Sequence, residues 1–361
     1  INQRVGALRL KNNSQFEERY MGYLLSEWKY QKLFISIATS SGGQANLSPK
    51  QILGSPLQYP PLAEQKAIAH ILGTLDDKIE LNRRMNETLE EMAHTLFKSW
   101  FVDFDPVRAK LDGRQPAGMD AETAALFPAE FQDSELGKIP KGWEVKNLDD
   151  LVDFVIGGDW GKAEPSEEFN SPVLCIRGAD IPELQNYQLG KMPARYIKER
   201  SLEKRNLVDG DIVFEISGGS PTQSTGRPVL ITSPFLKSIG QSVTCSNFCR
   251  LIRLTQPNAP AFLYFYLRYL YNRDIFLQYE NGTTGIKNLA FKIFASTFPF
   301  VLPSDTVLTC FNTEVGKLMT MANSNSSQSR SLTSLRDTLL PKLLSGELRI
   351  KDAEKFVEDA V

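Results

Sequence analysis

Residues 61–101, PLAEQKAIAHILGTLDDKIELNRRMNETLEEMAHTLFKSWF, decide the fold of this 361-residue chain. Alternating steps of four and three separate the members of one series along it: Ile68, Leu72, Leu75, Ile79, Asn82, Asn86, Leu89, Ala93, Leu96 and Trp100. That spacing places the side chains on one stripe of an α-helix, as in a coiled coil. We therefore expect one helix over residues 62–101, roughly 60 Å long at about 1.5 Å per residue.

A second series follows 243 positions later: Phe311, Val315, Leu318, Ala322, Asn325, Ser329, Leu332, Arg336, Leu339 and Leu343. Two such helices can pack antiparallel about a pseudo-twofold axis, where Asn82 and Asn325 would meet and fix the register at some cost in stability. Composition alone favours a loop at residues 323–331, NSNSSQSRS, and Pro341 should kink or end the helix. The periodicity favours a continuous helix.

An internal repeat surrounds the two series. Residues 20–25 resemble residues 262–267, an offset of 242, and the same offset joins Gly43 to Gly285, residues 46–47 to 288–289, and Pro61 to Pro303. Chance alone would rarely keep such landmarks in register. Each copy predicts a helix, a polar loop, a short apolar stretch, and a proline that opens a long helix.

The rest of the chain suggests an α/β domain. Residues 105–142 are rich in proline and glycine, as in a connector, whereas residues 212–216 and 228–231 are typical of strands. We expect an α/β (α+β) class fold, in which α/β domains are joined by two long antiparallel, coiled-coil-like helices. The expected segments are 1–60, the end of a first α/β domain; 61–104, a long helix; 105–142, a connector; 143–303, a second α/β domain; 304–346, a long helix; and 347–361, a tail.

Several kinds of chemistry are missing from the sequence. The two histidines, His70 and His94, fall on outward positions of the helix, and the four cysteines form no paired C-x-x-C motif, which argues against a metal site. No cofactor loop and no catalytic constellation is evident, so we predict no catalytic, cofactor-binding or metal-binding residue. No apolar run is long enough to cross a bilayer, and the cysteine usage fits a cytoplasmic protein.

Recognition of a linear ligand remains, and double-stranded DNA is the natural candidate. Polar loops offer donors and acceptors for base edges, and basic residues can face phosphates. Residues 143–304 carry 17 basic and 17 acidic residues, so a basic surface must be local, as at residues 191–205. The candidate DNA-binding residues are Ser41, Gly43, Gln44, Lys198, Arg200, Lys204, Arg205, Ser217, Ser220, Thr222, Gln223, Thr225, Arg227, Asn281, Thr283, Thr284 and Lys287.

Three motifs carry a resemblance to a known family. Residues 61–68, PLAEQKAI, open the first long helix; residues 98–106, KSWFVDFDP, close it; and residues 137–143, GKIPKGW, begin the second α/β domain. With the ending LLSGELRI at residues 343–350, they resemble the specificity subunits of type I restriction-modification systems.

The resemblance implies two target recognition domains that each read one half of a split DNA site, with the helices as a ruler between them. It implies no catalysis by this chain. The implied partners are two methyltransferase subunits, which hold S-adenosylmethionine and modify adenine, and motor-nuclease subunits, which use ATP and Mg. A complete member would have about 100 more residues before Ile1, and without them the first recognition domain could not form its full sheet.

That departure leaves alternatives open. The chain could be a fragment, a shortened subunit with one complete reader, or the specificity region of a fused restriction-methyltransferase. A rival interpretation is a protein-binding scaffold whose helix pair docks helical partners, and the salt dependence of DNA affinity discriminates it from a DNA reader.

Overall fold

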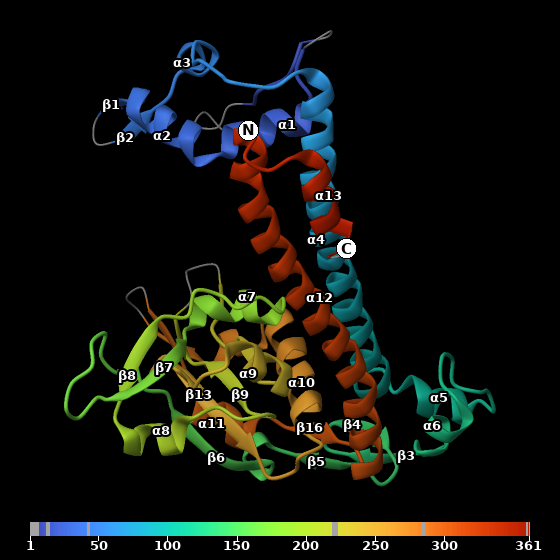
Figure 1. Ribbon diagram of the computed structural model, residues 1–361. Helices are drawn as coiled ribbons and strands as arrows, with labels where there is room; N and C mark the ends of the chain where they lie inside the picture. Colours follow the sequence, from blue (N-terminus) through green and yellow to red (C-terminus); the bar gives the residue numbers. More distant parts are fainter. Residues whose placement is uncertain are drawn as a thin grey trace. The chain divides into compact units, whose positions relative to one another are not determined.

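The structure, a computed structural model, describes residues 7–11, 15–41, 44–218, 223–282, 286–358 and 360 (Figure 1). The chain divides into two units: unit 1 comprises residues 1–84 and 327–361, and unit 2 comprises residues 85–326. Two long helices, α4 (Leu62–Phe101) and α12 (Asp305–Ser345), contribute residues to both. The helix predicted over residues 62–101 is confirmed.

The serine-rich stretch of α12 is helical, as the periodicity predicts. Its polar side chains bond back to the preceding turn, as Asn323 does to the Met319 carbonyl at 2.8 Å and Thr333 to the Ser329 carbonyl at 2.8 Å. The break predicted at Pro341 is not observed, because α12 continues to Ser345. Pro341 is close to the helix end, where Gly346 adopts a left-handed φ of 74°, so its missing N–H removes little of the helix.

Contacts within each unit show that α4 and α12 run antiparallel. In unit 1, Arg336 pairs with Asp76 at 2.7 Å, and the Asn82 amide donates to the Ser329 hydroxyl at 3.2 Å. In unit 2, the rings of Trp100 and Phe311 lie 5.8 Å apart. In unit 1 the contacts join residues 76–82 of α4 to residues 329–336 of α12, and in unit 2 they join the end of α4 to the beginning of α12.

Unit 1 packs short helices against the beginning of α4 and the end of α12. Its buried core includes Tyr20, Leu24, Leu72, Leu339 and Val357. Its other elements are α1 (Glu18–Ser26), α2 (Trp28–Ile37), β1 (Thr39–Ser41), β2 (Gln44–Asn46), α3 (Pro49–Leu53) and α13 (Ile350–Glu358).

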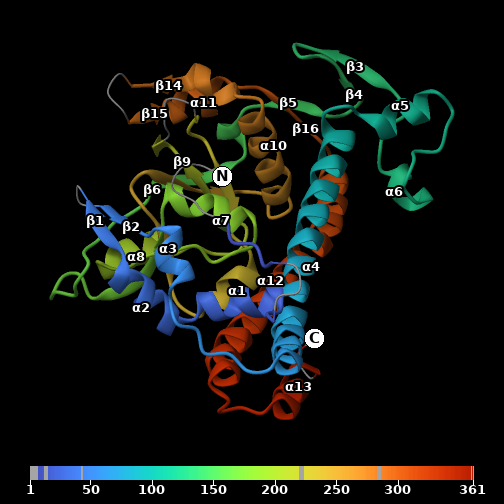
Figure 2. The ribbon, with the colours of Figure 1, turned by 90° about the horizontal axis from the view of Figure 1, so that it is seen from above.

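The predicted repeat appears in the strand register. In unit 1, β1 and β2 form an antiparallel hairpin in which Thr39 faces Asn46. In unit 2, β14 (Glu280–Asn281) and β15 (Lys287–Leu289) form a hairpin in which Asn281 faces Asn288. Since 242 positions separate Thr39 from Asn281 and Asn46 from Asn288, the two hairpins are equivalent elements of the repeat. Both are labelled in Figure 2.

Unit 2 is built on a four-stranded antiparallel sheet in the order β11-β9-β13-β6. Side chains along β9 point alternately to the two faces of the sheet, and each face has its own core. Ile212 and Phe214 pack with the apolar face of α10, whereas Val213 packs with Ile176 and Val243 on the other face. The bounds are β6 (Val152–Gly157), β9 (Ile212–Glu215), β11 (Pro228–Leu230), β13 (Cys249–Leu254) and α10 (Pro260–Asn272). The strands predicted near residues 212–216 and 228–231 are therefore confirmed.

Smaller elements complete unit 2. A three-stranded sheet has the order β12-β7-β8, another has the order β10-β15-β14, and β5 pairs with β16. Their bounds are β5 (Glu144–Lys146), β7 (Ser171–Ile176), β8 (Ala194–Ile197), β10 (Ser217–Gly218), β12 (Val243–Cys245), β16 (Phe300–Leu302), α7 (Ile181–Gln185), α8 (Glu199–Arg205), α9 (Ser233–Ile239) and α11 (Phe291–Thr297), with 3-10 turns at Leu148–Asp150, Gly178–Asp180 and Ile275–Tyr279.

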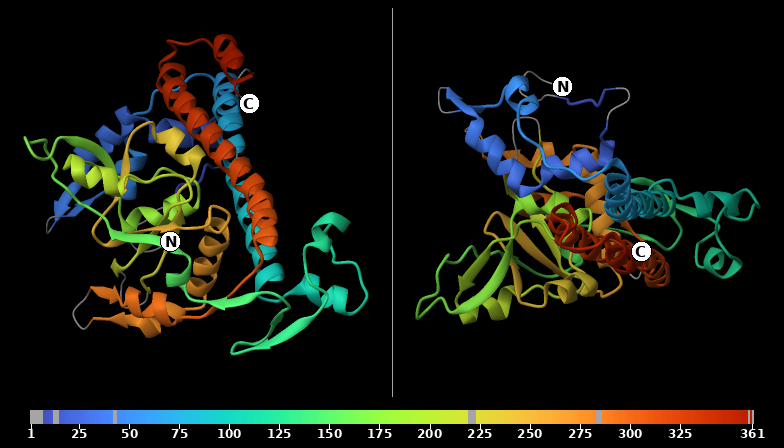
Figure 3. Two further views of the ribbon diagram at one scale, coloured as in Figure 1. Left: turned by 90° about the horizontal axis from the view of Figure 1, so that it is seen from below. Right: turned by 45° about the horizontal axis from the view of Figure 1, so that its top comes forward.

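The segment predicted to be a connector contains regular structure. It holds α5 (Asp105–Leu111), α6 (Ala121–Ala125) and the hairpin of β3 (Phe131–Ser134) and β4 (Gly137–Pro140), drawn in teal and green in Figure 3. Proline and glycine are used there at positions that begin or end elements: Pro106 opens α5, and Gly137 has a φ of 91° at the hairpin turn.

The prediction that His94 points into solvent is wrong. Its ring packs edge-on against Phe265 at 5.1 Å, and its Nε2 lies 3.3 Å from a carboxylate oxygen of Glu90. Glu90 also pairs with Arg268 of α10 and accepts from the Tyr187 hydroxyl at 3.1 Å. Burial alone would raise the pKa of Glu90, but these three partners lower it. This polar cluster fastens α4 to α10 within unit 2.

Candidate nucleic-acid interface

Two of the predicted DNA-binding loops, at residues 217–227 and 281–287, begin from one small sheet in unit 2. In this sheet Ser217 of β10 faces Asn288 of β15, and Asn281 of β14 faces Asn288 from the other side. The Ser217 hydroxyl donates to the Asn288 side-chain oxygen at 2.5 Å. The sheet therefore brings together polar segments that lie some 70 positions apart in the sequence.

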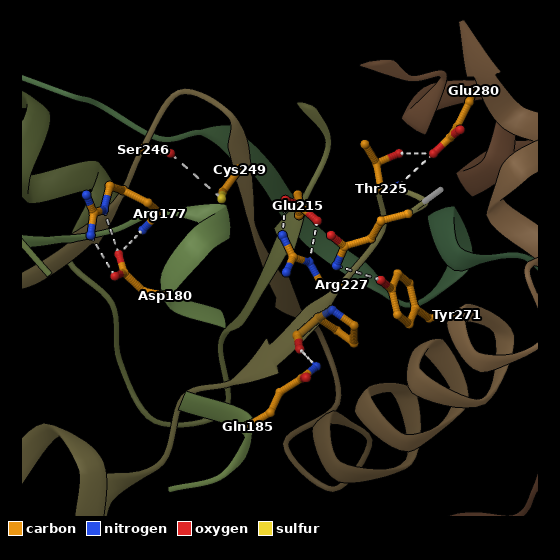
Figure 4. Close-up of polar contacts among 12 residues, drawn as sticks. Arg177, Asp180, Gln185, Glu215, Thr225, Arg227, Ser246, Cys249, Tyr271 and Glu280 are labelled. Carbon is orange, nitrogen blue, oxygen red and sulfur yellow. Dashed lines mark hydrogen bonds and ion pairs between the residues drawn. The ribbon is translucent and has the colours of Figure 1, made fainter. Parts of the chain in front are cut away.

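Glu280 ties the bases of the two loops together. One carboxylate oxygen accepts from the backbone N–H of Thr225 at 2.6 Å and from its hydroxyl at 3.0 Å (Figure 4). The other carboxylate oxygen lies 2.9 Å from the Lys287 ammonium. Thr225 is fully buried. The structure thus places Thr225 and Lys287, both predicted to contact DNA, in contacts that hold the loops.

Arg227, the last residue of the first loop, is anchored to Glu215 at the end of β9. Its guanidinium makes two hydrogen bonds to Glu215, at 2.8 and 2.6 Å, and the Glu215 side chain is only 2% exposed (Figure 4). Burial by itself would lower the pKa of Arg227, but the Glu215 carboxylate raises it. The guanidinium is therefore held in place by Glu215, and the DNA contact predicted for Arg227 stays a prediction.

Sequence reasoning missed Glu215 and the two glycines that surround it. A Cβ on Gly178 would clash with the Glu215 carboxylate, and a Cβ on Gly218 would lie 3.1 Å from it. The signal for these residues was an apolar strand that ends in a carboxylate, with an arginine immediately before the strand segment at residues 228–230.

The predicted basic patch at residues 191–205 separates into residues with different tasks. Lys198 pairs with Glu168 at 2.6 Å, and Arg205 donates to the Gly157 carbonyl at 2.8 Å. Arg200 and Lys204 are exposed on α8. Of the four predicted phosphate contacts in this patch, Lys198 is exposed but paired with Glu168, whereas Arg200 and Lys204 have no ion-pair partner among the described residues.

An exposed stacked pair beside α8 was also missed. The Arg195 guanidinium lies 4.3 Å from the centre of the Trp160 ring and donates to the Trp160 carbonyl at 2.9 Å. The Trp160 side chain is 37% exposed. Aromatic residues interleaved with basic ones, as at residues 160–162 and 195–198, were the available signal.

The remaining candidates fall into three groups. Gln223 is exposed and its amide donates to the Tyr271 hydroxyl at 3.4 Å, and Asn281 is exposed in β14. Ser41 and Gln44 belong to the hairpin β1–β2 of unit 1. Gly43, Ser220, Thr222, Thr283 and Thr284 lie outside the described residues.

The two predicted register residues lie at the helix seam within separate units. Asn82 donates to the Gln328 side chain at 2.9 Å and to Ser329, whereas Asn325 donates to the Asn86 side-chain oxygen at 2.9 Å. Asn86 in turn donates to the Ser326 hydroxyl at 2.9 Å. A contact between Asn82 and Asn325 would join the two units and stays a prediction.

The described part of the chain offers neither a metal-binding group of side chains nor an exposed cysteine. It contains no group of three or more histidine, cysteine or acidic side chains that could hold a metal ion. Cys175, Cys245 and Cys249 are buried, and burial raises the pKa of Cys175 and Cys249 to about 12. None of the described helices has the length and apolar character needed to span a bilayer.

Comparison with known proteins agrees with the resemblance seen in the motifs. Residues 1–91 match the family model for the type I restriction modification DNA specificity domain. The chain is 29% identical to the type I restriction enzyme HindI specificity subunit of Haemophilus influenzae, over 81% of this chain and 69% of that one. It is 28% identical to the MjaIX specificity subunit of Methanocaldococcus jannaschii, over 82% of this chain and 61% of that one.

A solved structure shares the fold. The S subunit of a type I restriction-modification system from M. genitalium superposes with a TM-score of 0.50 at 16% identity, over 91% of this chain and 73% of that one. The motifs, the matched domain and the fold agree, and this chain is similar to the specificity subunits of type I restriction-modification systems.

Proposed function

We propose that this chain reads double-stranded DNA and sets the sequence specificity of a type I restriction-modification complex. One observation carries the proposal: the sheet β10-β15-β14 brings together the bases of two polar loops, and unit 1 repeats the β14–β15 hairpin in the same register. Loops of this kind suit the reading of base edges, because base edges are distinguished by patterns of hydrogen-bond donors and acceptors.

Within unit 2 we assign different tasks to the polar residues. Gln223 and Asn281, which are exposed, would reach base edges, and Arg200 and Lys204 would contact phosphates. Glu215, Glu280 and their partners would hold the loops in a fixed shape. Preorganised loops lose less conformational entropy on binding, so this support would favour affinity.

The chemistry would belong to partner subunits. Two methyltransferase subunits would bring S-adenosylmethionine and modify adenine, and motor-nuclease subunits would use ATP and Mg to cleave unmodified DNA. The complex would work in the cytoplasm. The helices α4 and α12 would set the distance between the two halves of a split site.

Methylome sequencing tests the proposal. A strain that expresses this chain together with its neighbouring methyltransferase subunit should acquire a split adenine motif that neither protein produces alone. The double variant Gln223→Ala/Asn281→Ala should relax one half of that motif while the complex still assembles. A stable complex that adds no motif would contradict the proposal.

A salt titration separates a DNA reader from a protein-binding scaffold. The reconstituted complex should bind DNA at low salt and lose affinity as salt rises, because bound phosphates release counterions. A reconstituted complex that shows no DNA affinity at low salt would favour the protein-binding scaffold.

A further inference from the structure

A phenylalanine of unit 2 is exposed at the tip of a tight turn. Phe248 lies between β12 and β13 and is 49% exposed, and Asn247 beside it is also exposed. The flanking residues Ser246 and Cys249 are buried, and the Cys249 N–H donates to the Ser246 carbonyl at 2.9 Å, which closes the turn. Among the described residues of unit 2, Phe248 is the one phenylalanine whose side chain is exposed.

Main-chain hydrogen bonds fix this turn to its neighbours. The Ser246 N–H donates to the Ile176 carbonyl at the end of β7 at 2.8 Å, and the Gly158 N–H donates to the Cys249 carbonyl at 3.2 Å. A Cβ on Gly158 would clash with the carbonyl oxygens of Cys245 and Ser246, so the glycine permits this close approach. The position of the turn therefore does not depend on a flexible loop.

The turn lies next to the first of the polar loops proposed to read DNA. The Phe248 carbonyl accepts from the N–H of Ile216 at 2.9 Å and from the N–H of Ser217 at 3.1 Å. Ser217 begins β10, from which the first loop departs. Cys249, the residue after Phe248, pairs with Glu215 across the sheet, and both are labelled in Figure 4. An apolar side chain is thus placed beside a loop rich in hydrogen-bonding groups.

This combination matches a feature of the major groove of DNA. Thymine presents a C5-methyl group there, and phenylalanine is one of the side chains that contact it. Apolar side chains can also insert between base steps as wedges, but a wedge must leave the protein surface almost entirely. About half of the surface of Phe248 is covered by protein, which suits contact with a methyl group better than insertion.

We propose that Phe248 is a specificity-determining residue that contacts the C5-methyl group of a thymine in the half-site read by unit 2. The inference rests on the proposed DNA reading and adds one base and one chemical group to it. The polar loops supply hydrogen bonds to base edges. The ring favours thymine because it covers a methyl group that the other three standard bases lack.

The test removes this methyl group from the DNA. The complex of the chain with its neighbouring methyltransferase subunit is titrated with duplexes that carry the motif found by methylome sequencing. Each thymine of the motif is replaced in turn by deoxyuridine. At one thymine the uracil duplex should bind about fourfold more weakly, as expected for the burial of one methyl group. If no such replacement weakens binding by the unsubstituted chain, the proposal is wrong.

Variants of the chain assign the effect to Phe248. With Phe248→Ala the thymine and uracil duplexes should bind equally at that position, whereas Phe248→Leu, which keeps an apolar side chain, should retain part of the preference. Phe356→Ala is the matched control, because Phe356 of α13 is 53% exposed and belongs to unit 1, and it should leave the fourfold preference unchanged. A preference for thymine that persists in full with Phe248→Ala would overturn the proposal.

The remaining outcomes separate this inference from the proposed function. A complex that specifies no motif overturns both. A complex that specifies a motif but binds the thymine and uracil duplexes alike overturns only the role of Phe248. If Phe248→Ala is folded by circular dichroism but no longer assembles with the methyltransferase subunit, the ring belongs to a protein interface, and the proposal is again overturned.

Discussion

Replacement of Arg227 by methionine should strongly destabilise unit 2. The substitution keeps most of the apolar stem of the side chain but leaves the Glu215 carboxylate, which is 2% exposed, without the two hydrogen bonds of 2.8 and 2.6 Å that neutralise it. Loss of one partner of a buried ion pair costs about 3–5 kcal/mol. For a unit of this size, that loss corresponds to a fall in Tm of roughly 6–20 °C.

The double variant Glu215→Gln/Arg227→Met should recover most of this loss. Glutamine keeps the shape of Glu215 without its charge, so no uncompensated carboxylate stays buried, and the expected cost falls to about 1–3 kcal/mol. Arg200→Met is the matched control, because Arg200 is exposed on α8, and it should change stability by less than about 0.5 kcal/mol.

Urea unfolding of the full chain measures these differences. Three of the four tryptophans, Trp100, Trp143 and Trp160, belong to unit 2, so tryptophan fluorescence follows mainly that unit. Because Arg227 anchors the end of a loop proposed to read DNA, Arg227→Met should weaken DNA binding by the same factor at all salt concentrations. A loss below about 1 kcal/mol for Arg227→Met, or a double variant as unstable as the single one, would refute the assignment of a buried support.

Three further predictions address the glycine contacts, the phosphate contacts and the helix pair. Gly178→Ala should cost about 1–3 kcal/mol in urea unfolding, since its Cβ would clash with Glu215, whereas Gly316→Ala in α12, where a Cβ meets nothing within 4 Å, should stabilise by about 0.5–1 kcal/mol. Arg200→Ala and Lys204→Ala should each reduce the salt dependence of DNA affinity by about one counterion without loss of stability; an unchanged slope would exclude them as phosphate contacts. Deletion of residues 79–85 together with residues 326–332 removes about 10 Å from each helix and should shorten the spacer of the recognised site by roughly three base pairs in a methylome; an unchanged spacer would contradict the ruler.

Periodicity and repetition predicted much of the fold. The step pattern of residues 68–100 predicted α4, and the offset of 242 predicted two copies of one pattern, each with a polar loop that the structure shows to lie in a hairpin of the same register. The roles of individual site residues were less accessible. Whether an arginine faces solvent or a buried carboxylate depends on residues distant in the sequence: Arg200 and Arg227 look alike in composition, but Glu215 engages only the second.

The serine-rich part of α12 shows why composition misleads and pattern does not. Ser, Thr and Asn are poor helix formers because their side chains compete for backbone groups. In α12 that competition is settled by partners on α4: Asn86 donates to Ser326 and accepts from Asn325, all within unit 2. The small polar residues thus provide a lining that satisfies asparagine amides in a largely buried seam, where Asn86 is 9% exposed. An apolar seam would be more stable but would tolerate sliding by one heptad, and an asparagine displaced into apolar surroundings would lose its hydrogen bonds. A helix pair that measures a distance needs one register more than it needs maximal stability, and the serine-rich sequence fits that requirement.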